Sequence, residues 1–135
     1  MSGPKVKLGF IKLGKALISL EAVLEEYKIR PNRFLVDSAI KRFEYTIELF
    51  WKLLKVLFEE QGQKLNFPKE ILSKAYMSGL IDNELAWLSM IDARNATSHT
   101  YDEHAADEVF ESIQKNIITL RNTYDNLSNK FGKNN

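Results

Sequence analysis

Two long runs of apolar residues, each recurring every three or four positions, constrain the fold of this chain more than any other feature. The first run is Val6, Phe10, Leu13, Leu17, Leu20, Leu24 and Tyr27, and the second is Val36, Ile40, Phe43, Ile47, Phe50, Leu54 and Leu57. Steps of three and four place side chains on one face of an α-helix. Pro31 separates the runs, because proline cannot continue a helical hydrogen-bond ladder. We therefore predict two long helices joined by residues 29–33.

A third, shorter helix is marked by the residues that begin and end helices. Gly62 supplies a stop for the second long helix, which we expect to end near Gln61. Pro68 suits the first turn of the next helix, and Gly79 suits the position just past its end.

Two more helices are predicted in the second half of the chain. Asp82 is a plausible N-cap for the fourth helix, with Ile81, Leu85 and Leu88 on its buried side. Thr100 and Glu103 have the spacing of a capping box and predict the start of the last helix. Its apolar stripe is Ala106, Val109, Ile113, Ile117, Leu120, Tyr124 and Leu127.

Five helices without a strand candidate predict an all-α, mostly up-and-down bundle, with the third and fourth helices packed across one end or side. The length suits a single domain over residues 1–135, with a frayed tail at about 129–135. Trp51 and Phe58 lie beside the main stripe of the second helix. This apolar excess suggests a homodimer, or alternatively a wider intramolecular core.

The composition excludes several classes of function. The 135 residues include 19 basic and 18 acidic side chains, so attraction to nucleic acid would require a local basic patch. The absence of cysteine excludes disulfide scaffolds, thiolate zinc sites and cysteine nucleophiles. No run approaches the roughly 20 apolar residues that span a bilayer. We expect a soluble, cytoplasmic protein without membrane contact, and no cofactor, because glycine-rich phosphate loops are absent.

The most informative polar stretch is "RNATSHTYDEHAADEVF", residues 94–110, which contains both histidines of the chain. The stripe predicted for the fourth helix would continue through Asp92, Asn95 and His99. Half-buried polar groups require hydrogen-bond partners, so these residues either pair with neighbouring helices or line an opening. Taken singly, His99 suits a hydrogen-bonded turn, and Arg94 suits the negative end of a helix dipole.

Other chemistries fit this stretch less well. His104 falls in the first turn of the last helix and is expected to be exposed. The spacing of His99 and His104, without cysteine, matches no zinc motif, so no metal site is predicted. Ser98 does not lie in the glycine-flanked elbow of a serine hydrolase.

Two motifs together resemble a known superfamily. Arg94, His99 and Tyr101 form the pattern R-x4-H-x-Y at a junction between helices. The second helix, within residues 37–62, has the pattern RFE-x3-E-x2-WK, made by Arg42, Phe43, Glu44, Glu48, Trp51 and Lys52. The chain resembles the HEPN superfamily (higher eukaryotes and prokaryotes nucleotide-binding), in the branch named nucleotidyltransferase substrate-binding subunits, which is related to HepT toxins. The resemblance covers about residues 5–128.

The resemblance implies a homodimeric five-helix bundle that assembles with a minimal nucleotidyltransferase encoded beside it. In HEPN ribonucleases, Arg and His from both protomers form a metal-independent cleft that cleaves RNA. By position, Arg94 would stabilise phosphate charge, and His99 would act as general acid or base. Asn95 and Asp92 would bind substrate or support these two residues. Tyr101 would accept AMP from the nucleotidyltransferase, which silences the toxin.

Three interpretations follow. The first is a ribonuclease subunit of a two-component module, and the second is a non-catalytic subunit that binds a nucleotide or substrate for the nucleotidyltransferase. In the third, the polar turn only caps two helices. Acidic residues around the motif weaken the attraction for RNA, whereas a basic rim is available from Lys5, Lys7, Lys12, Lys15, Arg30, Arg33, Lys41 and Arg42. Those basic residues also suit an ordinary solvated helix face.

Overall fold

A computed structural model describes residues 3–132 of the chain, and five α-helices form its framework. These are α1 (Pro4–Ile29), α2 (Arg33–Glu60), α3 (Pro68–Met77), α4 (Glu84–Ala96) and α5 (Glu103–Leu127). Two short helical turns, η1 (Thr97–His99) and η2 (Ser128–Gly132), follow α4 and α5. Residues 3–132 contain no strand, so the all-α prediction is confirmed.

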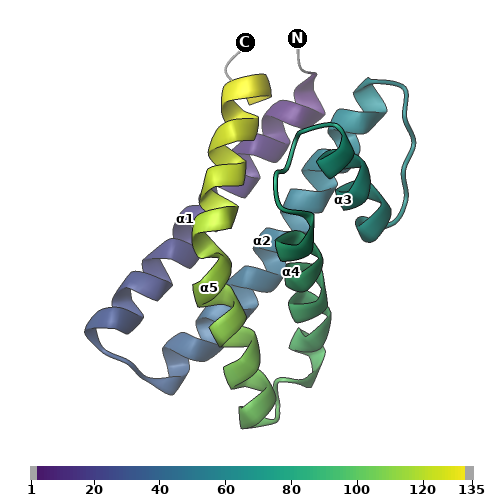
Figure 1. Cartoon of the computed structure of the whole chain (residues 1–135). Coiled ribbons are helices and arrows are strands. Elements are labelled where there is room, and N and C mark those ends of the chain that lie inside the picture. Colours follow the sequence, from purple (N-terminus) through teal and green to yellow (C-terminus); the bar gives the residue numbers. More distant parts are fainter. Residues whose placement is uncertain (1–2, 133–135) are drawn as a thin grey trace.

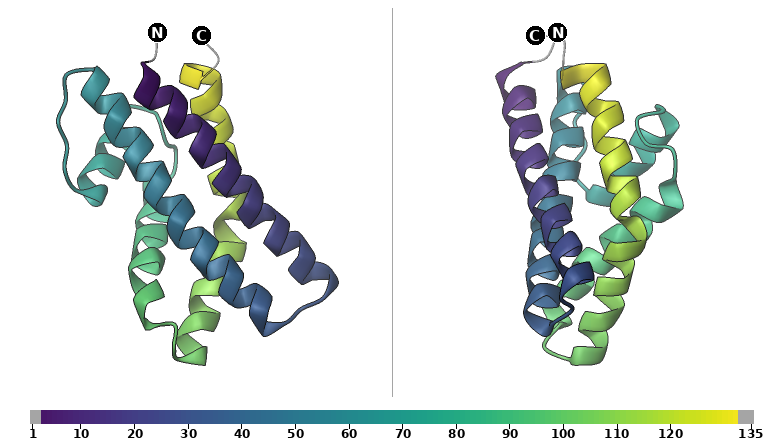
Figure 2. Two further views of the ribbon diagram at one scale, coloured as in Figure 1. Left: turned by 180° about the vertical axis from the view of Figure 1, so that it is seen from behind. Right: turned by 90° about the vertical axis from the view of Figure 1, so that its left-hand side faces the viewer.

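The long helices alternate in direction. In Figure 1, α1 descends, α2 rises, α4 descends and α5 rises, so both ends of the described chain lie at the same end of the bundle. The two views of Figure 2 show α3 beside the final turns of α2, apart from the lower half of the bundle. Both shorter helices were predicted to pack across one end or side of the bundle, and only α3 does so. The fourth helix, α4, instead runs beside α5 as a member of the bundle.

The hydrophobic core is continuous through all five helices, and α2 contributes to it on several sides. Phe58, which the sequence suggested as part of an apolar excess, is fully buried inside the single chain. Trp51 is half-buried and packs against the same core. The wider intramolecular core therefore accounts for Phe58 without a second copy of the chain.

The predicted helix stops are confirmed, but two predicted caps are wrong by one or two residues. Gly62 and Gly79 adopt positive φ angles of 83° and 77°, which end α2 and α3. The side chain of Asn83, not Asp82, caps α4 by accepting a hydrogen bond from the Ala86 amide at 3.0 Å. Asn and Asp are equally good N-caps, so their order alone does not decide between neighbours.

The predicted capping box of α5 does not form. Asp102 is the N-cap, and its carboxylate accepts from the His104 amide at 3.1 Å. The Thr100 hydroxyl instead donates to the Thr97 carbonyl at 3.0 Å. The cause is η1, which extends the chain past α4 and leaves Thr100 in the turn before α5.

The buried face of α4 also differs from the prediction. Leu85 is 79% exposed, whereas Trp87, Met90 and Ile91 are buried. The indole ring of Trp87 packs edge-on against Phe50, with ring centroids 4.8 Å apart. Burying this large side chain rotates α4 away from the predicted orientation.

The end of α5 is more ordered than a frayed tail. Residues 128–132 continue as η2, and Phe131 packs against the core. Residues 129–132 thus have helical geometry within the range where a frayed tail was predicted. Residues 133–135 lie outside the described part of the chain.

Candidate functional site

The residues of the R-x4-H-x-Y motif lie along the junction from α4 through η1 to α5. Arg94 is in the last turn of α4, and His99 is the final residue of η1. The Arg94 side chain is 31% exposed, His99 is exposed and Tyr101 is 89% exposed. The rotation of α4 explains why Asp92 and Asn95 are exposed, whereas the continued stripe predicted half-buried positions for them. The junction therefore presents most of its polar groups to solvent.

Arg94 is fixed by a carboxylate from α2. Its Nη2 donates to Glu48 Oε1 across the two helices. Glu48 Oε2 lies 3.8 Å from Lys52 Nζ on the same helix. Arg94 Nε is buried and has no acceptor among residues 3–132. The guanidinium is thus held in place without all of its donors being used.

A second contact between the same helices lies one turn away. The Thr97 hydroxyl is 2.6 Å from Glu44 Oε2 and 2.7 Å from the Arg94 carbonyl, and it donates to one of them at a time. This hydroxyl is the main cause that lowers the pKa of Glu44, with Lys41 and Arg94 adding favourable charge. The junction is therefore tied to α2 at two points.

These two contacts follow a spacing that the sequence contains. Glu44 and Glu48 are four residues apart on α2, and their partners Thr97 and Arg94 are three apart at the end of α4. Such spacings place each pair on one helix face. Sequence reasoning included the two glutamates in a motif but did not identify their partners, because the pairing is between distant parts of the chain.

Arg94 and Asn95 open onto a hollow of about 380 Å³, which we call the Trp51 pocket. It is lined by Glu48, Trp51, Phe67, Pro68, Lys69, Ile91, Arg94 and Asn95. Asp92 does not line the pocket but lies at 3.4 Å from Lys69 Nζ in an exposed ion pair. Of the predicted site residues, the pocket therefore brings Arg94 and Asn95 together.

Tyr101 lines a different hollow of about 470 Å³, whose other lining residues include Lys41, Glu44, Thr97 and Ser98. His99 lines neither this hollow nor the Trp51 pocket. The His99 and Tyr101 rings meet edge-on, with centroids 6.5 Å apart. Within one chain, Arg94 and Tyr101 thus line two different hollows, and His99 lines neither of them.

The basic residues of the first two helices divide between two environments. Lys12, Lys15 and Arg42 line a small hollow of about 270 Å³ with Tyr45. Arg33 instead donates to Asp107 Oδ1 at 2.6 Å and to the Glu103 carbonyl at 3.2 Å. Arg33 therefore helps to neutralise the acidic start of α5.

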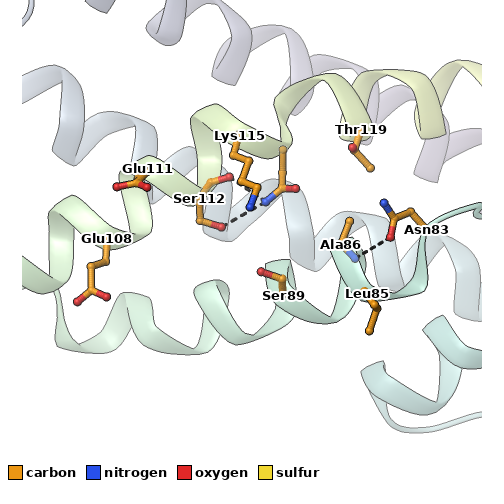
Figure 3. A pocket seen from close by; sticks show the side chains of 10 residues that line it. Asn83, Leu85, Ala86, Ser89, Glu108, Glu111, Ser112, Lys115 and Thr119 are labelled. Carbon is orange, nitrogen blue, oxygen red and sulfur yellow. Dashed lines mark hydrogen bonds between the residues drawn. The ribbon is translucent and has the colours of Figure 1, made fainter.

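The largest hollow, about 720 Å³, contains none of the predicted site residues. It lies between α4 and α5, and Figure 3 shows Ser89, Ser112 and Lys115 among its lining side chains. The buried Asn116 amide beside it donates to the Ser112 carbonyl at 2.9 Å. Size alone therefore does not identify the functional surface.

Neither a metal-binding cluster nor a membrane-spanning helix is found in the described part of the chain. Among residues 3–132, His, Cys, Asp and Glu side chains nowhere form a group of three or more that could hold a metal ion. Over the same range, no helix is long and apolar enough to cross a bilayer.

Comparison with known proteins assigns the chain to a family. Residues 8–129 match the family described as nucleotidyltransferase substrate binding protein like. The chain belongs to this family. The match contains both α2 and the complete R-x4-H-x-Y motif.

Two proteins from Haemophilus influenzae are similar to this chain and agree with the family assignment. A Haemophilus influenzae protein described as a probable ribonuclease HepT is 34% identical over 126 residues, covering 83% of this chain and 86% of the relative. A solved structure from H. influenzae, described as the fold of a substrate-binding domain of a nucleotidyltransferase, is 28% identical with a TM-score of 0.78. That alignment covers 87% of this chain and 98% of the other.

A crystal structure from Thermus thermophilus has the same fold. Its TM-score is 0.72 at 30% identity, and the alignment covers 87% of this chain and 97% of the other. The five-helix bundle is thus shared with solved structures, as the resemblance to HEPN proteins implied.

Proposed function

We propose that this chain is the HEPN-type subunit of a two-component module, in which it binds a minimal nucleotidyltransferase and, as a homodimer, cleaves RNA with Arg94 and His99. The observation that carries the proposal is the state of Arg94. A carboxylate fixes this guanidinium through Nη2 on the lining of an open pocket, and an exposed imidazole follows five residues later. One relative is described as a probable ribonuclease, which supports the proposed cleavage, and one solved structure is described as a substrate-binding domain of a nucleotidyltransferase, which supports the proposed partner.

The proposed reaction needs a base, an acid and a group that stabilises charge. A ribose 2'-hydroxyl attacks the adjacent phosphorus, and a His99 imidazole accepts its proton. The P–O5' bond breaks, and the leaving 5'-oxygen takes a proton from an acid, for which His99 of the second copy is available. The products are a 2',3'-cyclic phosphate and a free 5'-hydroxyl. Arg94 binds the non-bridging oxygens, where negative charge grows in the transition state.

The homodimer is proposed because one chain does not complete this arrangement. His99 is exposed and lines neither of the two hollows that contain Arg94 and Tyr101. A second copy packed against the junction would bring two imidazoles and two guanidinium groups to one cleft. Closed two-fold dimers are the commonest assembly of such chains.

Tyr101 is the proposed site of control by the nucleotidyltransferase. Its phenol is 89% exposed, so a partner enzyme can reach the hydroxyl oxygen. That oxygen would attack the α-phosphorus of ATP, releasing pyrophosphate and placing AMP on the tyrosine. The added nucleotide would carry negative charge beside the His99 ring, which lies 6.5 Å from the Tyr101 ring, and would repel an RNA phosphate.

The two histidines provide a matched test of the catalytic half. In an assay with end-labelled single-stranded RNA, we expect His99→Ala to abolish cleavage and His104→Ala to retain it. His104 is an exposed residue whose ring lies 3.2 Å from the Glu108 carboxylate on the same helix. Equal activity of wild type and His99→Ala would contradict the proposed role of His99.

A non-catalytic binding subunit is the second proposal, favoured by the acidic residues at the start of α5 and by the description of the solved H. influenzae structure as a substrate-binding domain. It predicts a stable complex with the nucleotidyltransferase and no RNA product from wild type.

Mass spectrometry after co-expression with the adjacent nucleotidyltransferase tests the proposed transfer of AMP to Tyr101. An added mass of AMP on wild type, absent from Tyr101→Phe, is expected. A nucleotidyltransferase that is active on other acceptors but leaves Tyr101 unmodified would contradict it.

A further inference from the structure

The Trp51 pocket combines two aromatic rings from separate elements with polar groups of the motif. Trp51 comes from α2, whereas Phe67 is the N-cap residue of α3 and is 69% exposed. Phe67 is one of several exposed large apolar side chains of the chain, and it lines the same hollow as the Trp51 ring. The pocket therefore presents apolar ring surface beside Arg94 and Asn95.

The polar groups of the pocket suit an anionic ligand with hydrogen-bonding edges. Arg94 brings a guanidinium to the lining, and Asn95 carries an amide that can both donate and accept. Lys69 adds a second cation at the rim, where Asp92 is its exposed partner. The one carboxylate of the lining, Glu48, is already paired with Arg94 and Lys52.

We infer that the Trp51 pocket binds the nucleobase of a nucleotide next to the phosphate held by Arg94, with the base stacked on Trp51 and Phe67. Stacking on aromatic side chains is the usual way proteins hold bases of single-stranded RNA, and it tolerates any base. Asn95 then contacts the edge of the base, and Lys69 contacts a flanking phosphate. This inference rests on the proposed ribonuclease function and specifies how the substrate is positioned.

A nucleobase fits this lining better than an apolar side chain of a protein partner. The centre of a protein interface is depleted in lysine and glutamate, whereas Lys69 and Glu48 both line this pocket. The arrangement also explains why Arg94 is fixed at the rim and not buried further. The same guanidinium can contact a phosphate while the attached base enters the hollow.

The two tryptophans of the chain allow binding to be measured directly. Trp87→Phe leaves Trp51 as the single fluorophore, and Trp87 Nε1 makes no hydrogen bond within residues 3–132 that phenylalanine would lose. The probe is a single-stranded 2'-O-methyl RNA decamer, which lacks the attacking hydroxyl. We expect saturable quenching of Trp51 fluorescence. Phe67→Ala should weaken it about tenfold or more, the effect of losing one stacking partner.

The control for Phe67→Ala is Ile118→Ala, which removes an equally exposed apolar side chain from α5, outside every hollow described above. It should leave the binding curve unchanged. Absence of quenching, or quenching that Phe67→Ala does not weaken, would overturn the base site. Quenching by the nucleotidyltransferase but not by the decamer would overturn it in favour of a protein contact.

Cleavage by chains that retain Trp87 separates this inference from the proposed function. Phe67→Ala should raise the KM for labelled RNA about tenfold and leave kcat nearly unchanged, while Ile118→Ala changes neither. If cleavage depends on His99 but not on Phe67, the base site is wrong and the ribonuclease stands. If wild type yields no product but Phe67-dependent quenching is present, the base site stands and the ribonuclease is wrong.

Discussion

Arg94 and Arg121 are two arginines with nearly the same exposure and different use of their donors. Their side chains are 31% and 30% exposed, and each pairs with a glutamate from another helix. Arg121 donates from Nε and Nη2 to both oxygens of Glu21, at 2.9 and 2.5 Å, and from Nη1 to Asp125 at 3.1 Å. Its guanidinium also lies 5.6 Å from the centre of the Tyr124 ring.

Arg94 has one carboxylate contact, from Nη2 to Glu48, and its side chain lines an open pocket. Arg121 donates from all three of its nitrogens and joins α5 to α1, whereas Arg94 donates from Nη2 alone within residues 3–132. The hydrogen bonds from Arg121 to Glu21 raise its pKa further above its ordinary value, so its charge is permanent. Under the proposed function, the use of donors within the protein, and not burial, distinguishes Arg94 from Arg121.

The largest expected effect is on catalysis. Arg94→Ala should lower the rate of RNA cleavage by about 100-fold or more, because one charge-stabilising donor contributes that much in comparable sites. The fold should persist, since Glu48 retains Lys52 as a partner. Rates and circular dichroism spectra of the purified variant test both statements. If the variant lost its helical signal as well as its activity, Arg94 would be needed for folding, as Arg121 is expected to be, and the two arginines would not differ in role.

A smaller effect, on stability, is expected at Arg121. Arg121→Ala should reduce the free energy of unfolding by about 2 kcal/mol, the scale of charge-assisted hydrogen bonds that are partly exposed to solvent. Cleavage per folded molecule should change less than about twofold, because the α1–α5 contact is not part of the site. Urea denaturation measures the first quantity. An unchanged midpoint would show that Arg121 is not the structural member of the comparison.

The smallest expected effect is on the contact that holds the α4–α5 junction against α2. Thr97→Val removes the hydroxyl that lowers the pKa of Glu44 and should cost about 1 kcal/mol at neutral pH. A lowered folded pKa gives stability that is complete above the ordinary value of 4.5 and is lost as the pH falls through the folded value. The difference between wild type and Thr97→Val should therefore shrink below pH 4.5.

Thr100→Val is the matched control, because its hydroxyl donates to the Thr97 carbonyl and to no carboxylate. Its cost should not vary with pH over the same window. Denaturation curves at neutral pH and at acidic pH compare the two variants. A pH-independent cost of Thr97→Val would mean that its hydroxyl donates mainly to the Arg94 carbonyl.

Regular apolar spacing was sufficient to predict the long helices and the all-α fold, since each stripe must be buried. It was insufficient for α4, because Leu85 and Trp87 are both apolar and only the fit of Trp87 against Phe50 decides which is buried. Thr100 and Asp102 are likewise both suitable N-cap residues for α5. The short turn η1 places Asp102, and not Thr100, at the start of the helix.

For the candidate site too, the sequence predicted features that are local in the chain and missed those that join distant segments. The motif located Arg94, Asn95, His99 and Tyr101 at one junction, because they are close in sequence. The sequence did not predict the partners of Arg94 or Arg121, since Glu48 and Glu21 are 46 and 100 residues away along the chain. The Trp51 pocket was missed for this reason too, as its lining comes from α2, the start of α3 and α4.

The most direct test of the contrast is to replace each arginine by lysine and to measure both cleavage rate and melting temperature. Lysine keeps the charge but lacks the planar fork of donors. We expect Arg94→Lys to lose most of its cleavage activity and to melt near the wild-type temperature, whereas Arg121→Lys should melt several degrees lower and cleave at the wild-type rate. The opposite pattern, or equal loss of both properties in the two variants, would contradict it.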